Sequence, residues 1–506
     1  MMVAERLGTG MPLARLLEGI TDVSALPEVD IKGLAADSRI LCAGDLFLAV
    51  AGLRSHGLDF IEQVLQRGAA AVLWEPADGY SVENLPVPCI AVEGLGQRLG
   101  QIADRFYGHP SRELHCIGVT GTDGKTSVTH FIAQSLAGAG RPCGLLGTLG
   151  YGVYGALQQP THTTPDALRL QAELAALRDK GVGVVAMEAS SHALHQGRCA
   201  AVAFDTAVLT NLSRDHLDYH GTLLAYTDAK RRLFHTPGLS TLVLNVDDAF
   251  GRELAASPPP GVALVCYSTD ARFEQRQCRG DWLHAQQVER LERGLRLSLV
   301  TSRWGTARLE TRLLGAFNAA NLLAALGALL AAGVDFDSAV QQLSRVDTVP
   351  GRMEAFGVHG QPLVVVDYAH TPNALDNALR ALRPHCRGEL VCVFGAGGDR
   401  DRGKRPRMGA VAEALADRVI LTNDNPRGED PGSILDQIAA GAQVPGRLQR
   451  IPDRAQAIDT AIQEAAADDL VLVAGKGHED YQQIGNRRLA FSDRARVQQA
   501  LRRFWT

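Results

Sequence analysis

A glycine-rich turn near residue 120 has the residue types of a phosphate-binding loop. An apolar run is followed there by Thr-Gly-Thr-Asp-Gly-Lys-Thr-Ser. Gly121 and Gly124 allow backbone N–H groups to approach phosphate oxygens. Lys125 supplies a positive charge for the terminal phosphates, and the Thr126 hydroxyl can ligate Mg²⁺. Val119 stands where the usual G-x-x-x-x-G-K-[ST] pattern has its first glycine, so an ordinary strand, turn and helix with an exposed lysine is the alternative.

The rest of the chain predicts the elements that position this loop. Short β-branched runs alternate with longer helical patterns, which predicts an α/β fold of mostly parallel sheets covered by helices. Ligands of open α/β sheets bind beyond the carboxyl ends of the strands, so the polar residues that close the strands are candidates for chemistry. The expected strands cover residues 69–74, 116–120, 182–188, 207–210, 242–245, 363–367, 390–394, 418–421 and 469–474.

Two breaks divide the chain into three predicted domains, in line with its length of 506 residues. A helical pattern over residues 94–107 precedes a Gly-His-Pro turn, and Pro350-Gly351 ends a second helical region. The predicted domains are residues 1–93, 94–347 and 348–506.

Composition and charge exclude several classes of protein. The 51 Lys and Arg against 56 Asp and Glu leave a net charge of -5, which provides no general attraction for nucleic acid or anionic membranes. The most apolar stretch, residues 322–334, is shorter than the ~20 residues that cross a bilayer, so we expect a buried helix. The nine cysteines form no C-x-x-C pair, and we expect reduced thiols. These features predict a cytoplasmic protein without nucleic-acid or membrane partners.

The phosphate loop resembles that of the Mur ligase family, ATP-dependent amide-forming enzymes of peptidoglycan precursor assembly. The resemblance implies three domains: an N-terminal domain for the UDP substrate, a central ATP-binding domain with a P-loop-type, mostly parallel sheet, and a Rossmann-like C-terminal domain for the amino acid. Six later segments support it in order along the chain: residues 187–192, 210–221, 367–372, 397–405, 424–427 and 475–479.

The segment Asp424-Asn-Pro-Arg427 is similar to that of the family members that add meso-diaminopimelate to the D-Glu carboxylate of UDP-MurNAc-L-Ala-D-Glu. A guanidinium group binds a second carboxylate through two hydrogen bonds, whereas it would repel the side chain of lysine. A simple Asn-Pro turn is the alternative. The resemblance implies an amino-acid site made of Arg400, Asp424, Asn425, Pro426, Arg427, Gly475 and Glu479.

The resemblance also implies that ATP activates the carboxylate as an acyl phosphate, with two Mg²⁺ ions. Glu188 and His216 follow expected strands and are candidate ligands beside Thr126. Lys230 would ordinarily be a solvated helix lysine, but the matching lysine of the family is carbamylated by CO₂ to N6-carboxylysine and helps to hold the second ion. Because this modification needs the neutral amine, we expect a site that lowers the pKa of Lys230. The implied catalytic set is Lys125, Glu188, His216 and Lys230, and the metal ligands are Thr126, Glu188, His216 and Lys230.

Further binding residues are implied by matching positions. Three of them, Asp123, Ser127 and His162, replace the family's usual Asn, Thr and Asn. Those implied for ATP are Gly121, Thr122, Asp123, Gly124, Lys125, Thr126, Ser127, Asn318, Arg352, Asp367 and His370. Those implied for the UDP-MurNAc-dipeptide are Ala36, Ser38, Leu53, Arg54, Ser55, His162, Thr163, Thr164, Ser190, Gln196 and Arg198. We expect His192, His195 and His220 to form local hydrogen bonds and not to ligate metal.

Three other functions fit the sequence less well. Arg427 argues against a lysine-adding relative, and the N-terminal segment argues against folylpolyglutamate synthase. A non-catalytic nucleotide-binding regulator is disfavoured because Glu188, His216 and Lys230 are all present. We therefore expect a monomeric enzyme that acts on small molecules.

Overall fold

The protein is described from a computed structural model, which covers residues 10–24, 26–52, 55–82, 84–160, 162–444, 446 and 448–505. Leu53 and Arg54, two of the predicted substrate contacts, lie outside these residues. The chain forms two compact units. The first contains residues up to 268, 274–283 and 324–339, and the second contains residues 269–273, 284–323 and 340 onwards.

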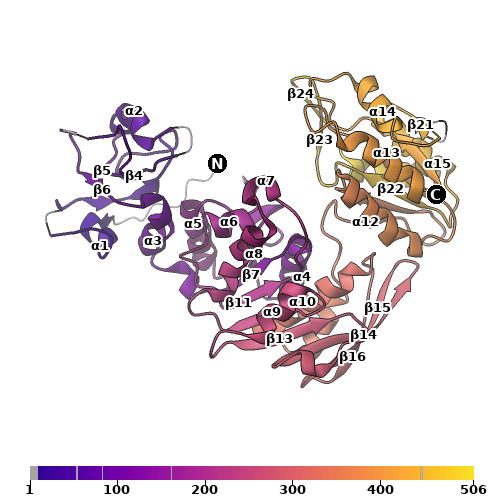
Figure 1. The fold of residues 1–506 in the computed structure, drawn as a ribbon, viewed down its shortest axis with the longest axis horizontal. Coiled ribbons are helices and arrows are strands. Elements are labelled where there is room, and N and C mark those ends of the chain that lie inside the picture. The colour runs from indigo at the N-terminus through magenta and orange to yellow at the C-terminus, as the bar shows by residue number, and fades with distance from the viewer. Residues whose placement is uncertain are drawn as a thin grey trace. The chain divides into compact units, whose positions relative to one another are not determined.

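The N-terminal part of the first unit is a four-stranded parallel sheet of order β3-β4-β5-β6 (Figure 1). Alternate residues of β4 point to opposite faces, as the two-residue period of a strand requires. Leu46 and Leu48 pack with residues of α1 and α3, while Phe47 and Ala49 pack with α2 and neighbouring loops. The bounds are β3 Gly33–Ala35, β4 Asp45–Ala49, β5 Ala71–Trp74, β6 Cys89–Ala91, α1 Leu13–Leu17, α2 Ile61–Gln66 and α3 Leu95–Phe106, with a small pair β1 Met11–Pro12 and β2 Asp30–Ile31.

A ten-stranded sheet follows, of order β16-β15-β14-β13-β12-β11-β7-β10-β8-β9. Strands β8, β10, β7, β11, β12 and β13 pair in parallel, whereas β9 runs antiparallel to β8 and β16 runs antiparallel to β15. The strands are β7 His115–Thr120, β8 Cys143–Gly147, β9 Gly150–Val153, β10 Val184–Glu188, β11 Thr206–Leu209, β12 Thr241–Asn245, β13 Ala263–Ser268, β14 Asp281–Leu291, β15 Gly294–Thr301 and β16 Thr306–Thr311. The helices are α4 Lys125–Gly138, α5 Ala167–Asp179, α6 Ser191–His195, α7 Leu217–His220, α8 Leu223–Arg231, α9 Ala249–Ala256, α10 Phe317–Ala331 and α11 Phe336–Leu343.

The position of β7 in this order brings three strand ends together. Because β7 lies between β11 and β10, the carboxyl ends at Thr120, Leu209 and Glu188 are neighbours at one edge of the sheet. Ligands of such sheets bind at this edge.

The second unit contains a six-stranded sheet of order β17-β18-β22-β19-β20-β21, parallel except for β17. Alternate residues of the strands are buried on opposite faces of this sheet. One face packs against α12, α13 and α14, and the other packs against α15 and α16. This is the predicted Rossmann-like arrangement, which Figure 1 shows in orange and yellow. The bounds are β17 Glu354–Phe356, β18 Leu363–Asp367, β19 Leu390–Phe394, β20 Arg418–Leu421, β21 Leu448–Arg450, β22 Leu470–Ala474, α12 Pro372–Leu382, α13 Lys404–Leu415, α14 Pro431–Ala439, α15 Arg454–Glu464 and α16 Asp493–Phe504, with a hairpin of β23 Tyr481–Ile484 and β24 Arg487–Ala490.

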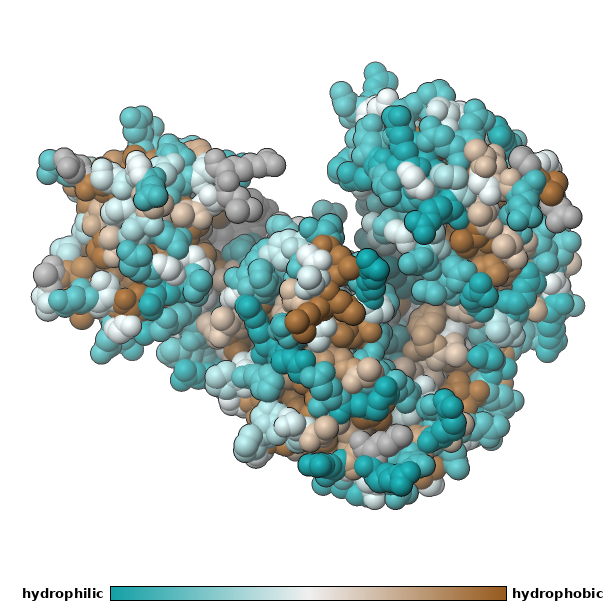
Figure 2. Space-filling model, in the orientation of Figure 1, coloured by the Kyte–Doolittle hydropathy of each residue, from teal (hydrophilic) through white to brown (hydrophobic). Residues whose placement is uncertain are grey.

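All nine expected strands are present, with bounds that differ from the expected ones by at most two residues. The expected alanine-rich helix is α10, whose leucines are nearly all buried. The face seen in Figure 2 is mainly hydrophilic, with small separate hydrophobic areas. Within the described part of the chain, no helix is both long and apolar enough to cross a membrane.

The expectation that every cysteine is a free thiol is wrong for one pair. Cys266 on β13 and Cys278 form a disulfide, with their Cα atoms 6.0 Å apart, while the other seven cysteines are free. The loop after β13 returns to the sheet and places these two side chains together. The two cysteines are 12 residues apart in sequence, and this spacing does not match a short motif that would predict their contact.

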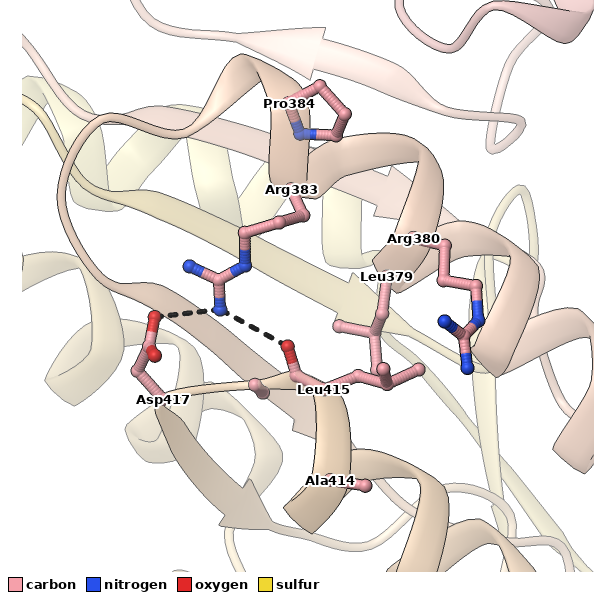
Figure 3. Close-up of a pocket in the computed structure, with 8 residues that line it drawn as sticks. Leu379, Arg380, Arg383, Pro384, Ala414, Leu415 and Asp417 are labelled. Atoms are coloured by element: carbon pink, nitrogen blue, oxygen red, sulfur yellow. Dashed lines mark hydrogen bonds and ion pairs between the residues drawn. The ribbon is translucent and has the colours of Figure 1, made fainter.

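A cavity of about 460 Å³ lies beside α12 and α13 (Figure 3). The Nη2 of Arg383 donates hydrogen bonds across it to Asp417 Oδ2, at 2.8 Å, and to the Leu415 carbonyl, at 3.1 Å. Asp417 directly precedes β20, so this cavity lies at the amino ends of the parallel strands. It is therefore at the opposite edge of the sheet from the predicted amino-acid site.

Candidate active site

The phosphate loop joins the end of β7 to the start of α4 and is held by the neighbouring strand end. Gly121 has φ +148°, and a Cβ there would lie 1.9 Å from Thr210 Oγ1, so this position requires glycine. Thr210 Oγ1 in turn donates to the Asp123 carbonyl at 2.6 Å. Lys125 Nζ donates to the Gly121 and Thr122 carbonyls, both at 2.8 Å. The loop is therefore preformed at a helix N-terminus, where backbone N–H groups attract anions.

Asp123, which replaces the family's usual Asn, contributes its backbone to this loop. Its N–H donates to Asn211 Oδ1 at 3.0 Å, and Asn211 Nδ2 donates to its carbonyl at 3.2 Å. The residue is exposed. Its carboxylate can thus remain solvated, which limits the cost of the extra negative charge.

Glu188 ends β10 and is only 1% exposed. Its carboxylate accepts hydrogen bonds from Thr126 Oγ1 at 3.0 Å, from Thr148 N at 2.7 Å and from Thr148 Oγ1 at 3.2 Å. Burial raises the pKa of Glu188, while these hydrogen bonds and the charge of Lys125 act in the opposite direction. A Cβ at Gly147 would lie 2.4 Å from Glu188 Oε1, so this glycine makes room for the carboxylate.

Lys230 lies on α8 and is 1% exposed. Its Nζ donates to the Gly121 carbonyl at 2.6 Å and lies 4.6 Å from the centre of the Tyr226 ring. Burial, with the nearby charge of Lys125, lowers the pKa of Lys230 to about 6. The expected lowering of this pKa is confirmed, and carbamylation remains a prediction.

His216 lies in a cluster of histidines, and its ring centre is 6.2 Å from that of Tyr226, the ring that Lys230 Nζ contacts. Its Nε2 is 3.4 Å from Asp215 Oδ2, and its ring centre is 4.9 Å from that of His192. His192 also lies 5.5 Å from His220, whose Nε2 is 3.1 Å from Ser191 Oγ. Of the predicted metal set, Thr126 and Glu188 are joined by a direct hydrogen bond, and Lys230 donates to the Gly121 carbonyl of the phosphate loop.

The fit of Mg²⁺ to these residues can be judged from their chemistry. Across the described residues, no three His, Cys, Asp or Glu side chains converge as a metal site. The Thr126 hydroxyl and the Glu188 carboxylate nevertheless offer adjacent oxygens, which are the ligands Mg²⁺ prefers. Because burial disfavours the ionised form of Glu188, a cation beside it would compensate that cost. The donors fit Mg²⁺.

Four of the residues predicted to hold the dipeptide, Thr164, Ser190, Gln196 and Arg198, form a hydrogen-bonded network that includes the Glu188 carbonyl. Thr164 Oγ1 donates to the Glu188 carbonyl at 2.7 Å and lies 3.1 Å from Ser190 Oγ. Arg198 donates to the Thr164 carbonyl at 3.0 Å and to Gln196 Oε1 at 2.8 Å. This network fixes the orientation of the predicted substrate contacts.

Thr148 links this network to the Glu188 carboxylate. Thr148 was not predicted from the sequence as a site residue. Its Oγ1 donates to Glu188 and also lies 3.2 Å from Thr163 Oγ1. Thr148 follows the carboxyl end of β8, so the strand-end rule could have found it. His162 uses its backbone, which donates to and accepts from the Tyr151 hydroxyl.

The predicted uridine-binding residues lie on the loops after β3 and β4. Ser38 is buried, and its Oγ donates to Gln63 Oε1 at 2.6 Å. Ala36 and Ser55 are exposed, and the Ser55 carbonyl accepts from the Gly52 N–H at 3.1 Å.

In the second unit, three of the four predicted nucleotide contacts lie at or near the end of β18. Asp367 accepts from the backbone N–H groups of residues 353 and 369, both at 2.8 Å, and burial raises its pKa. The Arg352 guanidinium stacks on Tyr368 at 4.9 Å, and His370 Nδ1 is 2.9 Å from the Tyr368 carbonyl. Asn318 instead lies on α10, where its Nδ2 donates to the Leu314 carbonyl at 2.8 Å.

The predicted amino-acid contacts converge on the loops after β19, β20 and β22. Asn425 Nδ2 donates to Glu479 Oε2 at 2.8 Å. The fully buried Lys476 donates to the same Glu479 oxygen at 2.8 Å and to Asn425 Oδ1 at 3.1 Å. Gly475 has φ +118°, and a Cβ there would lie 2.6 Å from Asp424 Oδ2. Lys476 was missed in the sequence, although it lies between two predicted contacts.

Arg427 and Arg400 flank Gly397 at this site. A Cβ at Gly397 would lie 2.9 Å from Arg427 Nη1 and 3.8 Å from Arg400 Cγ. Arg427 Nη1 donates to the Gly398 carbonyl at 2.7 Å, and Arg400 is exposed. The preceding Pro426 is buried. The Arg427 guanidinium and the side-chain stem of Arg400 thus stand beside one glycine, and a guanidinium group can bind a carboxylate through two hydrogen bonds.

Three family models match the chain: the Mur ligase family catalytic domain over residues 30–107, the Mur ligase middle domain over 119–329 and the Mur ligase glutamate ligase domain over 351–477. Over 500 residues the chain is 52% identical to the UDP-N-acetylmuramoyl-L-alanyl-D-glutamate--2,6-diaminopimelate ligase of Alkalilimnicola ehrlichii, covering 97% of this chain and 99% of the relative. The chain belongs to the Mur ligase family. The enzyme of the same name from Pseudomonas syringae is 50% identical over 463 residues, covering 92% of this chain and 93% of that one.

A solved structure of a UDP-N-acetylmuramoyl-L-alanyl-D-glutamate--2,6-diaminopimelate ligase has the same fold. It matches with a TM-score of 0.74 and 36% identity, covering 97% of this chain and 99% of the other. The expected Mur ligase architecture is confirmed. The family matches also agree with an enzyme that uses ATP to form an amide bond.

Proposed function

We propose that this Mur ligase adds meso-diaminopimelate to the D-Glu carboxylate of UDP-MurNAc-L-Ala-D-Glu, with ATP converted to ADP and phosphate. The observation that carries the proposal is the place of Arg427, beside Gly397 and at the carboxyl end of β20, in a chain 52% identical to a ligase with this substrate in its name. The reaction is a cytoplasmic step of peptidoglycan precursor synthesis. We also propose that residues 1–93 bind the UDP group, residues 94–347 bind ATP and residues 348–506 bind the amino acid, in a monomer.

The phosphates of ATP bind the loop at the start of α4. Backbone N–H groups of the loop donate hydrogen bonds to the phosphate oxygens, and Lys125 exchanges its present carbonyl partners for the terminal phosphate. Asn318, Arg352, Asp367 and His370 are the further nucleotide contacts in this proposal.

Thr126 and Glu188 hold one Mg²⁺ in this proposal, and His216 and carbamylated Lys230 help to hold a second. Bound Mg²⁺ supplies positive charge that offsets the repulsion between the phosphates and the carboxylate as the acyl phosphate forms. The Lys230 amine forms the carbamate by attacking CO₂ and losing one proton. Its lowered pKa leaves much of the amine neutral at neutral pH, which this step needs.

The dipeptide is oriented by the network around Thr164. Arg198, held by Thr164 and Gln196, supplies a positive charge for an anionic group of the substrate. Thr163 and Ser190 offer hydroxyls for its amides. The network begins at Glu188, so it places the substrate next to the proposed metal and the phosphate loop.

The amino acid is held by groups of both charges. Glu479 attracts an ammonium group, while Arg400 and Arg427 bind carboxylates. Asn425 and Lys476 hold the Glu479 carboxylate in place. Meso-diaminopimelate, with two amines and two carboxylates, matches this lining better than lysine, which lacks the second carboxylate.

Phosphate release from ATP tests the proposal directly. Purified protein receives UDP-MurNAc-L-Ala-D-Glu with either meso-diaminopimelate or L-lysine, and mass spectrometry identifies the nucleotide product. We expect diaminopimelate-dependent release and a product heavier by one diaminopimelate residue. A preference for lysine would overturn the role of Arg427, and no release with either amino acid would reject the function.

A further inference from the structure

An ion pair between the buried Arg405 and the little-exposed Glu429 joins two of the three loops of the amino-acid site, those after β19 and β20. Arg405 on α13 is 0% exposed, and it pairs with Glu429 through two hydrogen bonds of 2.9 and 2.8 Å. Its Nη1 also donates to Gln437 Oε1 at 2.8 Å. Because both terminal nitrogens of the guanidinium group are hydrogen-bonded to the carboxylate, Glu429 is fixed relative to α13.

Glu429 also holds the backbone of the facing loop. Its Oε1 accepts the Asp399 N–H at 2.6 Å, and Arg405 Nη2 donates to the Gly397 carbonyl at 3.1 Å. In the opposite direction, Asp399 Oδ2 accepts the Gly428 N–H at 3.0 Å. The loop after β19 and the loop after β20 are therefore locked to each other through Glu429.

These hydrogen bonds between the two loops determine where Arg427 is held. Arg427 has φ +50°, a conformation that non-glycine residues seldom adopt, and its Nη1 donates to the Gly398 carbonyl. Gly398 is the residue between the two loop positions that the ion pair holds, and its own N–H donates to the Asn425 carbonyl at 2.9 Å. The partner of the Arg427 guanidinium is thus kept in place by Glu429.

We propose that Glu429, held by Arg405, is a positioning residue that sets the orientation of Arg427 and thereby the selectivity for an amino acid with a second carboxylate. This inference rests on the proposed function. A guanidinium discriminates by forming two parallel hydrogen bonds, which fail when the fork is displaced by about 1 Å. The hydrogen bonds from Arg405 lower the pKa of Glu429 to about 2, so the Glu429 carboxylate is ionised near neutral pH.

The first test is Glu429→Gln, which keeps the shape of the side chain and removes its charge. We expect KM for meso-diaminopimelate to rise about tenfold, with KM for ATP and for UDP-MurNAc-L-Ala-D-Glu changed less than about twofold. Asp459→Asn is the matched control, because Asp459 is also a little-exposed carboxylate paired with an arginine, Arg496, but between α15 and α16. It should leave all three KM values unchanged.

A double-mutant cycle separates positioning from general structural damage. If Glu429 acts through Arg427, then adding Glu429→Gln to Arg427→Ala should change KM for meso-diaminopimelate by less than about twofold. If the two substitutions raised KM for meso-diaminopimelate independently, so that their effects multiplied in the double variant, the proposal would be overturned. An unchanged KM in Glu429→Gln alone would also overturn it. Lack of diaminopimelate-dependent phosphate release in the wild-type protein would instead reject the proposed function itself.

A second variant covers the case in which Glu429→Gln does not fold. Replacing both partners, as Arg405→Met with Glu429→Met, removes the uncompensated buried charge and is often tolerated. The folded double variant should show the same rise in KM and the same lack of further effect with Arg427→Ala. Wild-type KM in this variant would overturn the proposal.

Discussion

Thr126 Oγ1 donates a hydrogen bond of 3.0 Å to Glu188 Oε2, which joins the first turn of the phosphate-loop helix to the end of the neighbouring strand β10. Together with Thr148, it gives a buried carboxylate three hydrogen bonds on its two oxygens. The carboxylate is thus held in one orientation. An oxygen-lined site for a cation is therefore built by the fold itself, next to the phosphate loop.

Removing the charge of Glu188 should weaken both catalysis and the binding of Mg²⁺. For Glu188→Gln we expect kcat to fall about 10²-fold or more, because the proposed metal loses an anionic ligand at the reacting phosphate. The Mg²⁺ concentration at half-maximal rate should rise. Steady-state phosphate release over a Mg²⁺ titration measures both. Glu173→Gln, at a carboxylate paired with Arg169 on α5, is the control and should match the wild type.

The lowered pKa of Lys230 should appear as a pH dependence of stability. The folded pKa is about 6 and the ordinary value is 10.5, so between these values the unfolded chain binds a proton that the folded chain does not. Stability should therefore rise with pH in this window, by about 1.4 kcal/mol per pH unit more than in Lys230→Met. Urea unfolding near pH 7 and near pH 9, in buffers depleted of CO₂, measures the difference. Equal slopes would show that Lys230 is not buried as described.

Changing Arg427 to lysine should reveal whether the guanidinium fork selects the amino acid. For Arg427→Lys we expect kcat/KM for meso-diaminopimelate to fall about 10²-fold, since an ammonium group cannot make the paired hydrogen bonds. The KM for ATP should stay unchanged. Arg450→Lys, at an exposed arginine paired with Asp436, is the control. An unaltered preference for diaminopimelate in Arg427→Lys would mean that another residue binds its second carboxylate.

The buried pair of Arg454 and Asp493 should matter for stability and not for selectivity. Both side chains are 0% exposed, and two hydrogen bonds of 2.7 Å join them. Asp493→Ala leaves a buried guanidinium without its partner, which should cost about 3–5 kcal/mol in the free energy of unfolding of this part of the chain. Replacing both, as Arg454→Met with Asp493→Leu, should recover most of that loss. Urea denaturation measures the series, and an equal loss in the double variant would contradict the explanation.

Several parts of the site could be predicted because their signals are local. The apolar run before Gly121, the two glycines and the following Lys125 lie within ten residues, and the strand, loop and helix form where that pattern indicates. Glu188 was found in the same way, because it closes a run of β-branched and apolar residues. The low pKa of Lys230 was expected only through the family resemblance, since nothing in its own segment indicates burial.

Other parts depend on contacts between distant segments. Thr148 meets Glu188 because β8 pairs with β10, and neither segment carries a sign of that pairing. Glu429 and Arg405 are 24 residues apart, and in the sequence both belong to ordinary charged loops and helices. The disulfide of Cys266 and Cys278 was missed for the same reason.

The α/β class, nine of the strands and the polar residues that end several of them could be predicted from local sequence patterns. Hydrophobic periodicity and glycine-rich turns act over a few residues, so they can be read without knowing the fold. The folded chain was needed to show which strand ends are neighbours, which charges are buried and which side chains hold Arg427 and Glu188 in place. The physical reason is that burial and hydrogen bonding depend on distance in space, which strand order and register set and local sequence does not.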